Sequence, residues 1–162
     1  MPLSPESKQT NIEKSLAAWV EAQLITAAGL TVFFQHASIA TRPNAWLQVD
    51  FLLGLRQEFG RQIDATRHGG RGHGVVNLLC CQKRGVQVDL YALATLRDSA
   101  MAAFQQGQAI VLRDYDTGGT PDIGIIIVHE TTEAQPDDGF VSGLIVRALS
   151  IHISYTEAYT FA

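Results

Sequence analysis

Two long apolar runs near the end of the chain, separated by a turn, constrain the fold most strongly. Residues Ile123–Glu133 and Phe140–Tyr159 are rich in β-branched and aromatic side chains, which favour strands. The segment between them contains the turn sequence Gln-Pro-Asp-Asp-Gly. Strands joined by such a short turn form an antiparallel hairpin. One face of the second strand is expected to carry Ile145, Leu149, Ile151, Ile153 and Tyr155, with Arg147 as the exception.

Apolar periodicity predicts two helices and four more strands. Apolar residues recur at helical spacing over Thr10–Ala28 and over Val86–Gln106, and a glycine follows each segment. The remaining strands are predicted at Leu30–His36, Trp46–Leu53, Val75–Gln82 and Ala109–Arg113. The strand Val75–Gln82 is apolar on both faces, so we expect it to lie in the centre of its sheet.

The order of these elements predicts the fold class. Helix, three strands, helix, three strands, with hairpins in each half, indicates a single α+β domain. We expect a mostly antiparallel sheet with both helices on one face and a long extended hairpin loop. The expected core joins the apolar stripes of both helices to Val75–Cys81 and Ile145–Ile153: Leu16, Trp19, Val20 and Leu24 from the first helix, and Leu93, Leu96, Ala100 and Phe104 from the second.

Length and composition fit one domain spanning residues 1–162, of which 1–9 are polar and expected to be flexible. A chain of this size buries roughly two-thirds of its unfolded surface, so it needs no disulfide or metal. The net charge of −4 argues against a basic nucleic-acid-binding surface. No apolar run reaches the roughly 18 residues of a membrane span. The polar start lacks the apolar stretch of a signal peptide, so we expect no membrane partner and a cytosolic origin.

Residues 54–74 interrupt the strand pattern and are predicted to form a long, mobile loop at a hairpin tip. Glycine occupies six of these positions, which leaves the backbone unusually free. We expect the loop to project and to contact other subunits or a partner, where its apolar residues could form a short helix or hook. A surface hairpin without any partner is the alternative. The candidate contact residues are Leu55, Arg56, Phe59, Arg61, Ile63, Arg67 and Arg71.

Charge is unevenly distributed along the chain. Residues 54–84 carry six basic and two acidic side chains, whereas residues 85–162 carry three basic and ten acidic ones. Copies of one chain could therefore present surfaces of opposite sign to each other. A scatter of solvated charges is the alternative interpretation.

The two cysteines, Cys80 and Cys81, are adjacent. Their side chains would point to opposite faces of a strand, which disfavours a disulfide between them. We expect two reduced thiols with at least one in the core. A redox pair or a metal site is the alternative, but no histidine stands at ligand spacing to them.

Each local pattern that suggests chemistry lacks a second essential group. His129-Glu130 has no histidine four residues later, as a zinc-protease helix requires. Asp116-Thr117-Gly118 lies in a polar turn that would keep its carboxylate solvated, unlike an aspartic-protease loop. The glycines around His73 lead into a strand, so a phosphate site would lack its helix. We therefore expect no catalytic residue, no metal and no cofactor.

The order of elements resembles the tail-terminator, or tail-completion, family of long-tailed bacteriophages and related minor tail proteins. The resemblance rests on the helix NIEKSLAAWVEAQL, the strand TVFFQHA, the Pro-containing turn and strand RPNAWLQVDFL, and the strand GVVNLLCCQ before a second helix. The closing hairpin IIIVHETTEAQPDDGFVSGLIVRALSIHISY completes it. The similarity extends over most of the chain from about residue 11.

The resemblance implies a structural virion protein rather than an enzyme. Members of this family form a ring, usually of six subunits, that stacks on the tail tube, stops its growth and docks the head connector or stopper. The implied partners are therefore the chain itself, the tail tube protein and the connector, with DNA only passing through the ring. The implied location is the tail or neck of the virion, after assembly in the host cytoplasm. Another neck, head-completion or minor tail protein is the alternative, followed by a small cytosolic enzyme or ligand-binding domain.

Overall fold

The computed structural model of the chain describes residues 9–34, 43–64, 67–85, 91–134 and 143–156, and of residues 54–64 and 67–71 it describes the backbone only. The elements are α1 (Gln9–Val20), the π-helix η2 (Glu21–Ala27), β1 (Val32–Phe34), β2 (Ala45–Asp64), β3 (Arg67–Lys83), α2 (Ala92–Ala103), β4 (Ala109–Arg113), β5 (Asp122–Ala134) and β6 (Leu144–Thr156). This order confirms the α+β prediction.

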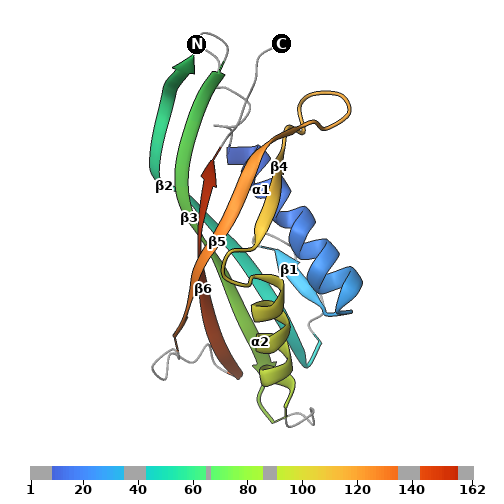
Figure 1. The fold of residues 1–162 in the computed structure, drawn as a ribbon. Coiled ribbons are helices and arrows are strands. Elements are labelled where there is room, and N and C mark those ends of the chain that lie inside the picture. Colours follow the sequence, from blue (N-terminus) through green and yellow to red (C-terminus); the bar gives the residue numbers. More distant parts are fainter. Residues whose placement is uncertain (1–8, 35–42, 65–66, 86–90, 135–142, 157–162) are drawn as a thin grey trace.

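Six strands form one curled sheet in the order β1-β2-β3-β6-β5-β4 (Figure 1). Every neighbouring pair is antiparallel except β1 and β2. β3 pairs with both β2 and β6, which confirms its predicted central place. β5 and β6 form the predicted antiparallel pair, while the turn sequence between them lies outside the described residues.

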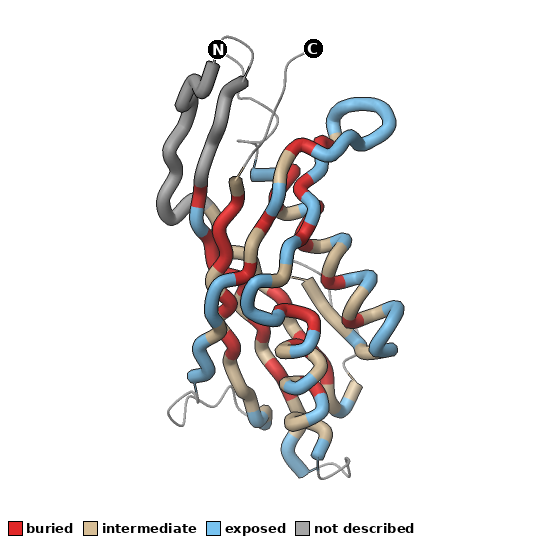
Figure 2. The backbone as a smooth tube through the Cα atoms, viewed as in Figure 1, coloured by how far each residue is buried: buried red, intermediate tan, exposed pale blue. Residues whose placement is uncertain are grey.

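The core lies between the helices and one face of the sheet (Figure 2). Leu16, Val20 and Leu24 are fully buried, as is Ala100, and Trp19 and Leu93 pack half-buried against them. Burial of each large apolar side chain contributes about 1.5–3 kcal/mol, so this stripe holds the helices on the sheet. The predicted core is therefore confirmed. Because successive strand residues alternate, Val76, Leu78 and Cys80 face this core while their neighbours face the other side.

The helices are shorter or less regular than predicted. The first ends as an α-helix at Val20 and continues as η2, while Leu24 remains buried. The second begins at Ala92 rather than Val86, and residues 86–90 lie outside the described part. It ends at Ala103 because Phe104 leaves the helical conformation to enter the core. Of the strands predicted at Leu30–His36 and Phe140–Tyr159, the structure describes β1 (Val32–Phe34) and β6 (Leu144–Thr156).

The long hairpin predicted at residues 54–74 is present, but its residues are not an irregular loop: they continue β2 and β3 as paired strands (Figure 1). Cross-strand pairing runs out to Asp64 and Arg67, with register shifts after Leu53, Glu58 and Gln62. The short helix or hook that we expect on contact with a partner stays a prediction, because this structure contains one chain alone. Apolar residues four positions apart fit one face of a regular strand as well as one face of a helix. Here the backbone hydrogen bonds between β2 and β3 favour the strand.

Candidate assembly surface

The outer part of the β2–β3 hairpin, residues 54–64 and 67–74, is called the ribbon below. Its register places the predicted contact residues on both strands. Arg67 stands opposite Asp64, and Arg71 stands opposite Glu58. The other two arginines have no acidic residue opposite them: Arg56 faces His73 and Arg61 faces Gly69. The three apolar candidates fall at the register shifts of the hairpin: Leu55, Phe59 and Ile63.

Two glycines at the base of the ribbon lie against side chains of neighbouring strands. A Cβ on Gly72 would lie 1.9 Å from Cζ of Tyr155, and one on Gly74 would lie 2.8 Å from Cδ2 of Leu53. Tyr155 is 2% exposed, so its ring has no free space into which it could move. These glycines therefore provide room for side chains from neighbouring strands, and the sequence-based view of them as sources of flexibility is wrong.

The ribbon loses its neighbouring strands at its base. β6 accompanies β3 only from Lys83 to Arg71, where Thr156 is the last paired residue. The described part of β1 ends at Phe34, opposite Val49 of β2. Beyond these points, within the described residues, the two strands of the ribbon pair only with each other. A two-stranded hairpin alone is marginally stable in water, so a further partner would stabilise the ribbon more than the rest of the sheet.

At the opposite edge of the sheet, α1 bonds the C-terminal end of β4 and the residues just after it. The backbone N–H of Arg113 donates to Ser15 Oγ at 3.0 Å, and that of Tyr115 donates to Asn11 Oδ1 at 3.0 Å. Asn11 and Ser15 are buried at 0% and 3% exposure. These side chains replace a neighbouring strand, so this edge does not offer those donors to another chain.

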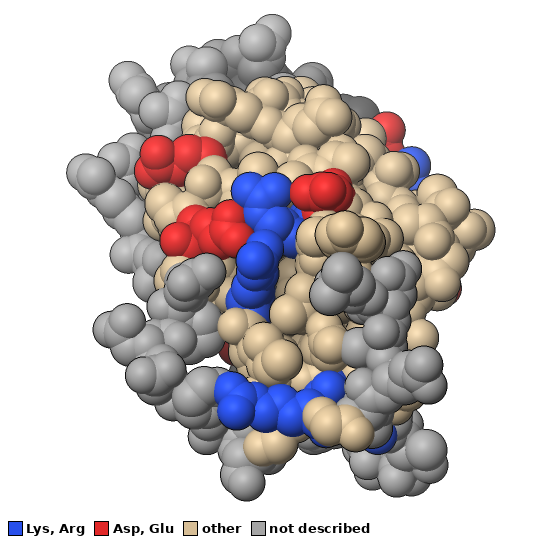
Figure 3. Space-filling view, turned by 90° about the horizontal axis from the view of Figure 1, so that it is seen from below, with Lys and Arg blue, Asp and Glu red and all other residues tan. Residues whose placement is uncertain are grey.

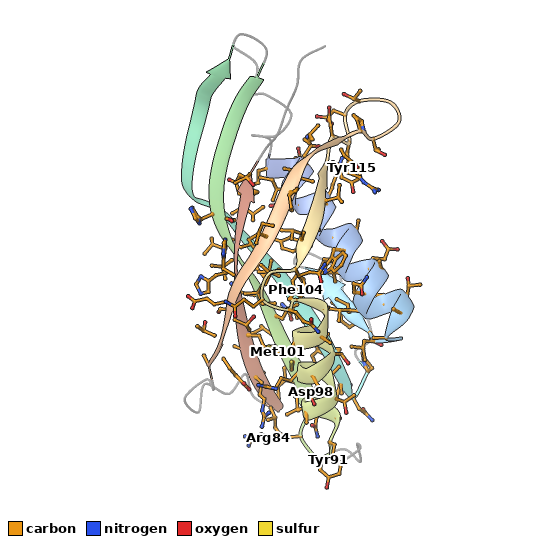
Figure 4. The ribbon with its side chains drawn as sticks, viewed as in Figure 1. Arg84, Tyr91, Asp98, Met101, Phe104 and Tyr115 are labelled. Atoms are coloured by element: carbon orange, nitrogen blue, oxygen red, sulfur yellow. The ribbon has the colours of Figure 1, made fainter. Side chains whose placement is uncertain are left out.

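A buried carboxylate organises the turn that follows β4. Asp114 is 3% exposed and accepts hydrogen bonds from Thr117 Oγ1 at 2.5 Å, the Asp116 N–H at 3.0 Å and Asn11 Nδ2 at 3.3 Å. Tyr115 projects beside α1, where Lys14 Nζ lies 5.7 Å from its ring centroid (Figure 4). Sequence reasoning missed Asn11, Ser15 and Asp114. The sequence signal that could have indicated Asn11 and Ser15 is their four-residue spacing beside the apolar stripe of α1.

The motifs considered for chemistry have structural explanations. Asp116 is exposed in the turn, as expected. His129 Nε2 lies 2.5 Å from Ser154 Oγ, and this contact joins β5 to β6 at the register shift between Val128 and Thr131. Among the described residues, no group of three His, Cys, Asp or Glu side chains could hold a metal ion.

Both cysteines are free and buried, which confirms the prediction of two separate thiols. Cys80 belongs to the core under the helices, whereas Cys81 stands opposite Trp46 on the other face of the sheet. Burial, and next the neighbouring Cys81, raise the pKa of the Cys80 thiol to about 12. A thiol with this pKa is an unreactive core group rather than a nucleophile.

An ion-pair network ties α2 to the sheet. Glu133 accepts a hydrogen bond from Arg97 Nε at 2.8 Å and lies 3.9 Å from Arg147 Nη1. Arg97 also bonds Asp98 at 3.1 Å, and these hydrogen bonds, first to Glu133 and then to Asp98, raise its pKa. Arg147, the one charged residue on its face of β6, therefore has an acidic neighbour. Seen from this end of the molecule, basic side chains form a row flanked by acidic ones (Figure 3).

Comparison with known proteins shows the fold alone. No protein-family model and no curated protein matches the chain. A solved structure whose name states no function is similar over 93% of this chain and 98% of its own, with a TM-score of 0.56 and 16% identity. In the described part of the chain, no helix has the length and apolar character needed to span a bilayer.

Proposed function

We propose that this chain is a ring-forming tail terminator of a long-tailed bacteriophage. In this role it caps the tail tube, stops its elongation and joins the tail to the head connector. The observation that carries the proposal is the ribbon: a paired hairpin that leaves a well-packed α+β body and, among the residues that the structure describes, has no neighbouring strand beyond its base. The resemblance of the element order to that family supports the same role.

The charge distribution suits a ring built from one chain. A closed ring uses head-to-tail contacts, in which two different surfaces of the same subunit meet. The ribbon carries four arginines and two acidic residues, whereas the whole chain has a net charge of −4. Basic ribbon and acidic body therefore attract between copies. The proposed further partners are the tail tube protein and the connector or stopper, with DNA passing through the ring in the virion.

The direct test combines native mass spectrometry of the purified protein with negative-stain imaging of the protein mixed with tail tubes. We expect a closed oligomer, with six subunits as the reference number, and a cap at one end of each tube. A ring that binds the connector but leaves tube growth unchanged would favour another neck protein. A monomer that retains a small molecule would favour an enzyme or a ligand-binding domain.

The ribbon can be shortened without touching the three-stranded part of the sheet. Removing residues 59–70 and joining Glu58 to Arg71 through an Asn-Gly turn keeps the last β3 position that β6 supports. We expect a folded monomer that no longer assembles or caps tubes, because the missing strands add little to the stability of one subunit. Far-UV circular dichroism and mass photometry measure these two properties.

The matched control changes only Ala65 and Thr66 to the same Asn-Gly pair and keeps the full ribbon. This control should assemble as the parent does. If the shortened protein also assembles and caps tubes normally, the ribbon has no part in assembly.

A further inference from the structure

The face of β4 and β5 that points away from the helices carries an exposed apolar patch. Ile110 and Ile126 belong to the core, so their neighbours in each strand point to the other side of the sheet. There Val111 and Ile125 stand directly opposite each other and are 44% and 47% exposed. The next pair on the same face continues the apolar surface. These four residues are called the outer patch below: Ala109, Val111, Ile125 and Ile127.

The outer patch departs from the usual pattern of a sheet with one face in water. An antiparallel sheet of that kind has polar residues on its solvent face, whereas strands that are apolar on both faces are normally covered on both. Farther along β5 the usual pattern returns, with His129, Glu130 and Thr132 exposed. Exposed apolar residues that touch one another inside a polar rim are typical of a surface that binds another protein.

The charge around the outer patch indicates which partner fits it. Along β5 the patch lies between Asp122, which pairs with Arg113, and Glu130, and both acidic residues are exposed. Residues 109–134 carry one basic and five acidic side chains, so two such patches placed face to face would repel each other. The ribbon carries four arginines, two acidic residues and the three apolar contact candidates. Its composition therefore complements the outer patch in both charge and apolar character.

The ribbon and the outer patch belong to different parts of one subunit. β4 ends the sheet on one side, and the ribbon continues β2 and β3 in the other half (Figure 1). In the register of the sheet, Thr156 of β6 separates Ile125 from Arg71 at the base of the ribbon. One subunit can therefore use both surfaces at the same time, as a head-to-tail contact requires.

We propose that the outer patch of one subunit receives the ribbon of a second copy of this chain. The contact buries Val111 and Ile125 against apolar residues of the ribbon, while the ribbon arginines approach Asp122 and Glu130. The proposal deepens the proposed function and rests on it only in requiring self-assembly. It concerns the contact between copies and does not depend on binding to a tail tube.

The first test combines Val111→Thr with Ile125→Thr. Threonine keeps the β-branched shape that suits a strand, but it makes the outer patch more polar. Below the assembly concentration, the melting temperature should stay within about 2 °C of the parent, because both positions are exposed. The concentration needed for half-assembly should rise about tenfold, since apolar area is lost from every contact. Sedimentation velocity over a dilution series gives this concentration.

The matched control is Ile145→Thr. Ile145 is also an exposed strand residue, but it stands opposite Gln82, at the end of β3 far from the ribbon. This control should assemble as the parent does. If the double variant instead melts more than about 5 °C below the parent, the outer patch is covered within one subunit and the inference is overturned.

A mixing experiment tests whether the contact is head-to-tail. The shortened chain described above keeps the outer patch and loses most of the ribbon, whereas Ile125→Arg keeps the ribbon and places a charge on the patch. Each protein should be monomeric alone, and the mixture should form dimers that contain one of each and grow no further. Dimers of the shortened chain alone would show patch against patch and overturn the inference. A mixture that stays monomeric well above the half-assembly concentration of the parent would overturn it too.

The outcomes separate this inference from the proposed function. Rings that form and cap tubes equally well with Ile125→Arg would overturn the inference and leave the function standing. Normal assembly with lost tube binding would assign the outer patch to the tube protein and also overturn the inference. Mixed dimers, from a parent that assembles but never caps tubes, would support the inference and contradict the function. A parent chain that is monomeric at all concentrations would contradict both.

Discussion

Gly72 lies beneath the ring of Tyr155, and this contact fixes the base of the ribbon. The hypothetical Cβ at 1.9 Å from Cζ of the ring leaves no room for any other residue. The same position therefore requires glycine for steric reasons, although its φ angle is not in the left-handed region. At the scale of single residues, the close approach of β3 and β6 determines which amino acid fits at position 72.

The first prediction follows from this contact. Gly72→Ala should lower the free energy of unfolding by about 1–3 kcal/mol, since the buried ring cannot move aside without disturbing the core. In a Tyr155→Leu background the same change should cost much less. Urea denaturation of the four proteins gives the coupling between the two sites. Equal cost in both backgrounds would show that the ring is not the obstacle.

Cys80 supports a prediction about pH. Its pKa rises from 9.0 to about 12 in the folded chain, so the thiolate forms more readily after unfolding. The contribution of the protonated Cys80 thiol to the free energy of unfolding is complete below pH 9 and is lost as the pH rises toward 12. At pH 10 the loss should be about 1 kcal/mol relative to pH 8. Denaturation of the parent and of Cys80→Val at both pH values isolates this contribution, and equal losses in the two proteins would contradict the prediction.

At the scale of elements, α1 acts as the missing neighbour of β4. Replacing Asn11 by alanine leaves the Tyr115 N–H without its buried acceptor, which should cost about 1–3 kcal/mol. Ser15→Ala should act in the same direction through the Arg113 N–H. The exposed residue Ala18 on the same helix provides a control, because Ala18→Gln should change stability by less than about 0.5 kcal/mol. Urea denaturation compares the three variants.

The elements also show what the sequence could and could not predict. Periodicity identified β3, β4 and the helix stripes because burial on one or two faces leaves a direct pattern in the apolar residues. The ribbon was missed because its glycines have low strand propensity, and the pairing partner and Tyr155 override that propensity. Asn11 and Asp114 were missed because a buried polar pair resembles a surface pair until the fold brings them together. The contact role of the arginines stays a prediction.

At the scale of the whole molecule, the sheet has different ends. Its β4 edge ends against a helix, and its β2 edge continues into the ribbon (Figure 1). Because the two edges differ, they give the subunit two unlike surfaces. A head-to-tail contact joins unlike surfaces of two copies, as the proposed ring requires.

The start of α1 and the end of β6 have a practical consequence for experiments. β6 ends at Thr156 opposite Arg71, at the base of the ribbon, and α1 begins where Asn11 contacts Asp114, on the same side of the body (Figure 1). A bulky group attached beside Gln9 or Thr156 would lie on the side that we propose for assembly. A small epitope inserted near Gly85, beyond the far end of β3, would report on the subunit from a distance.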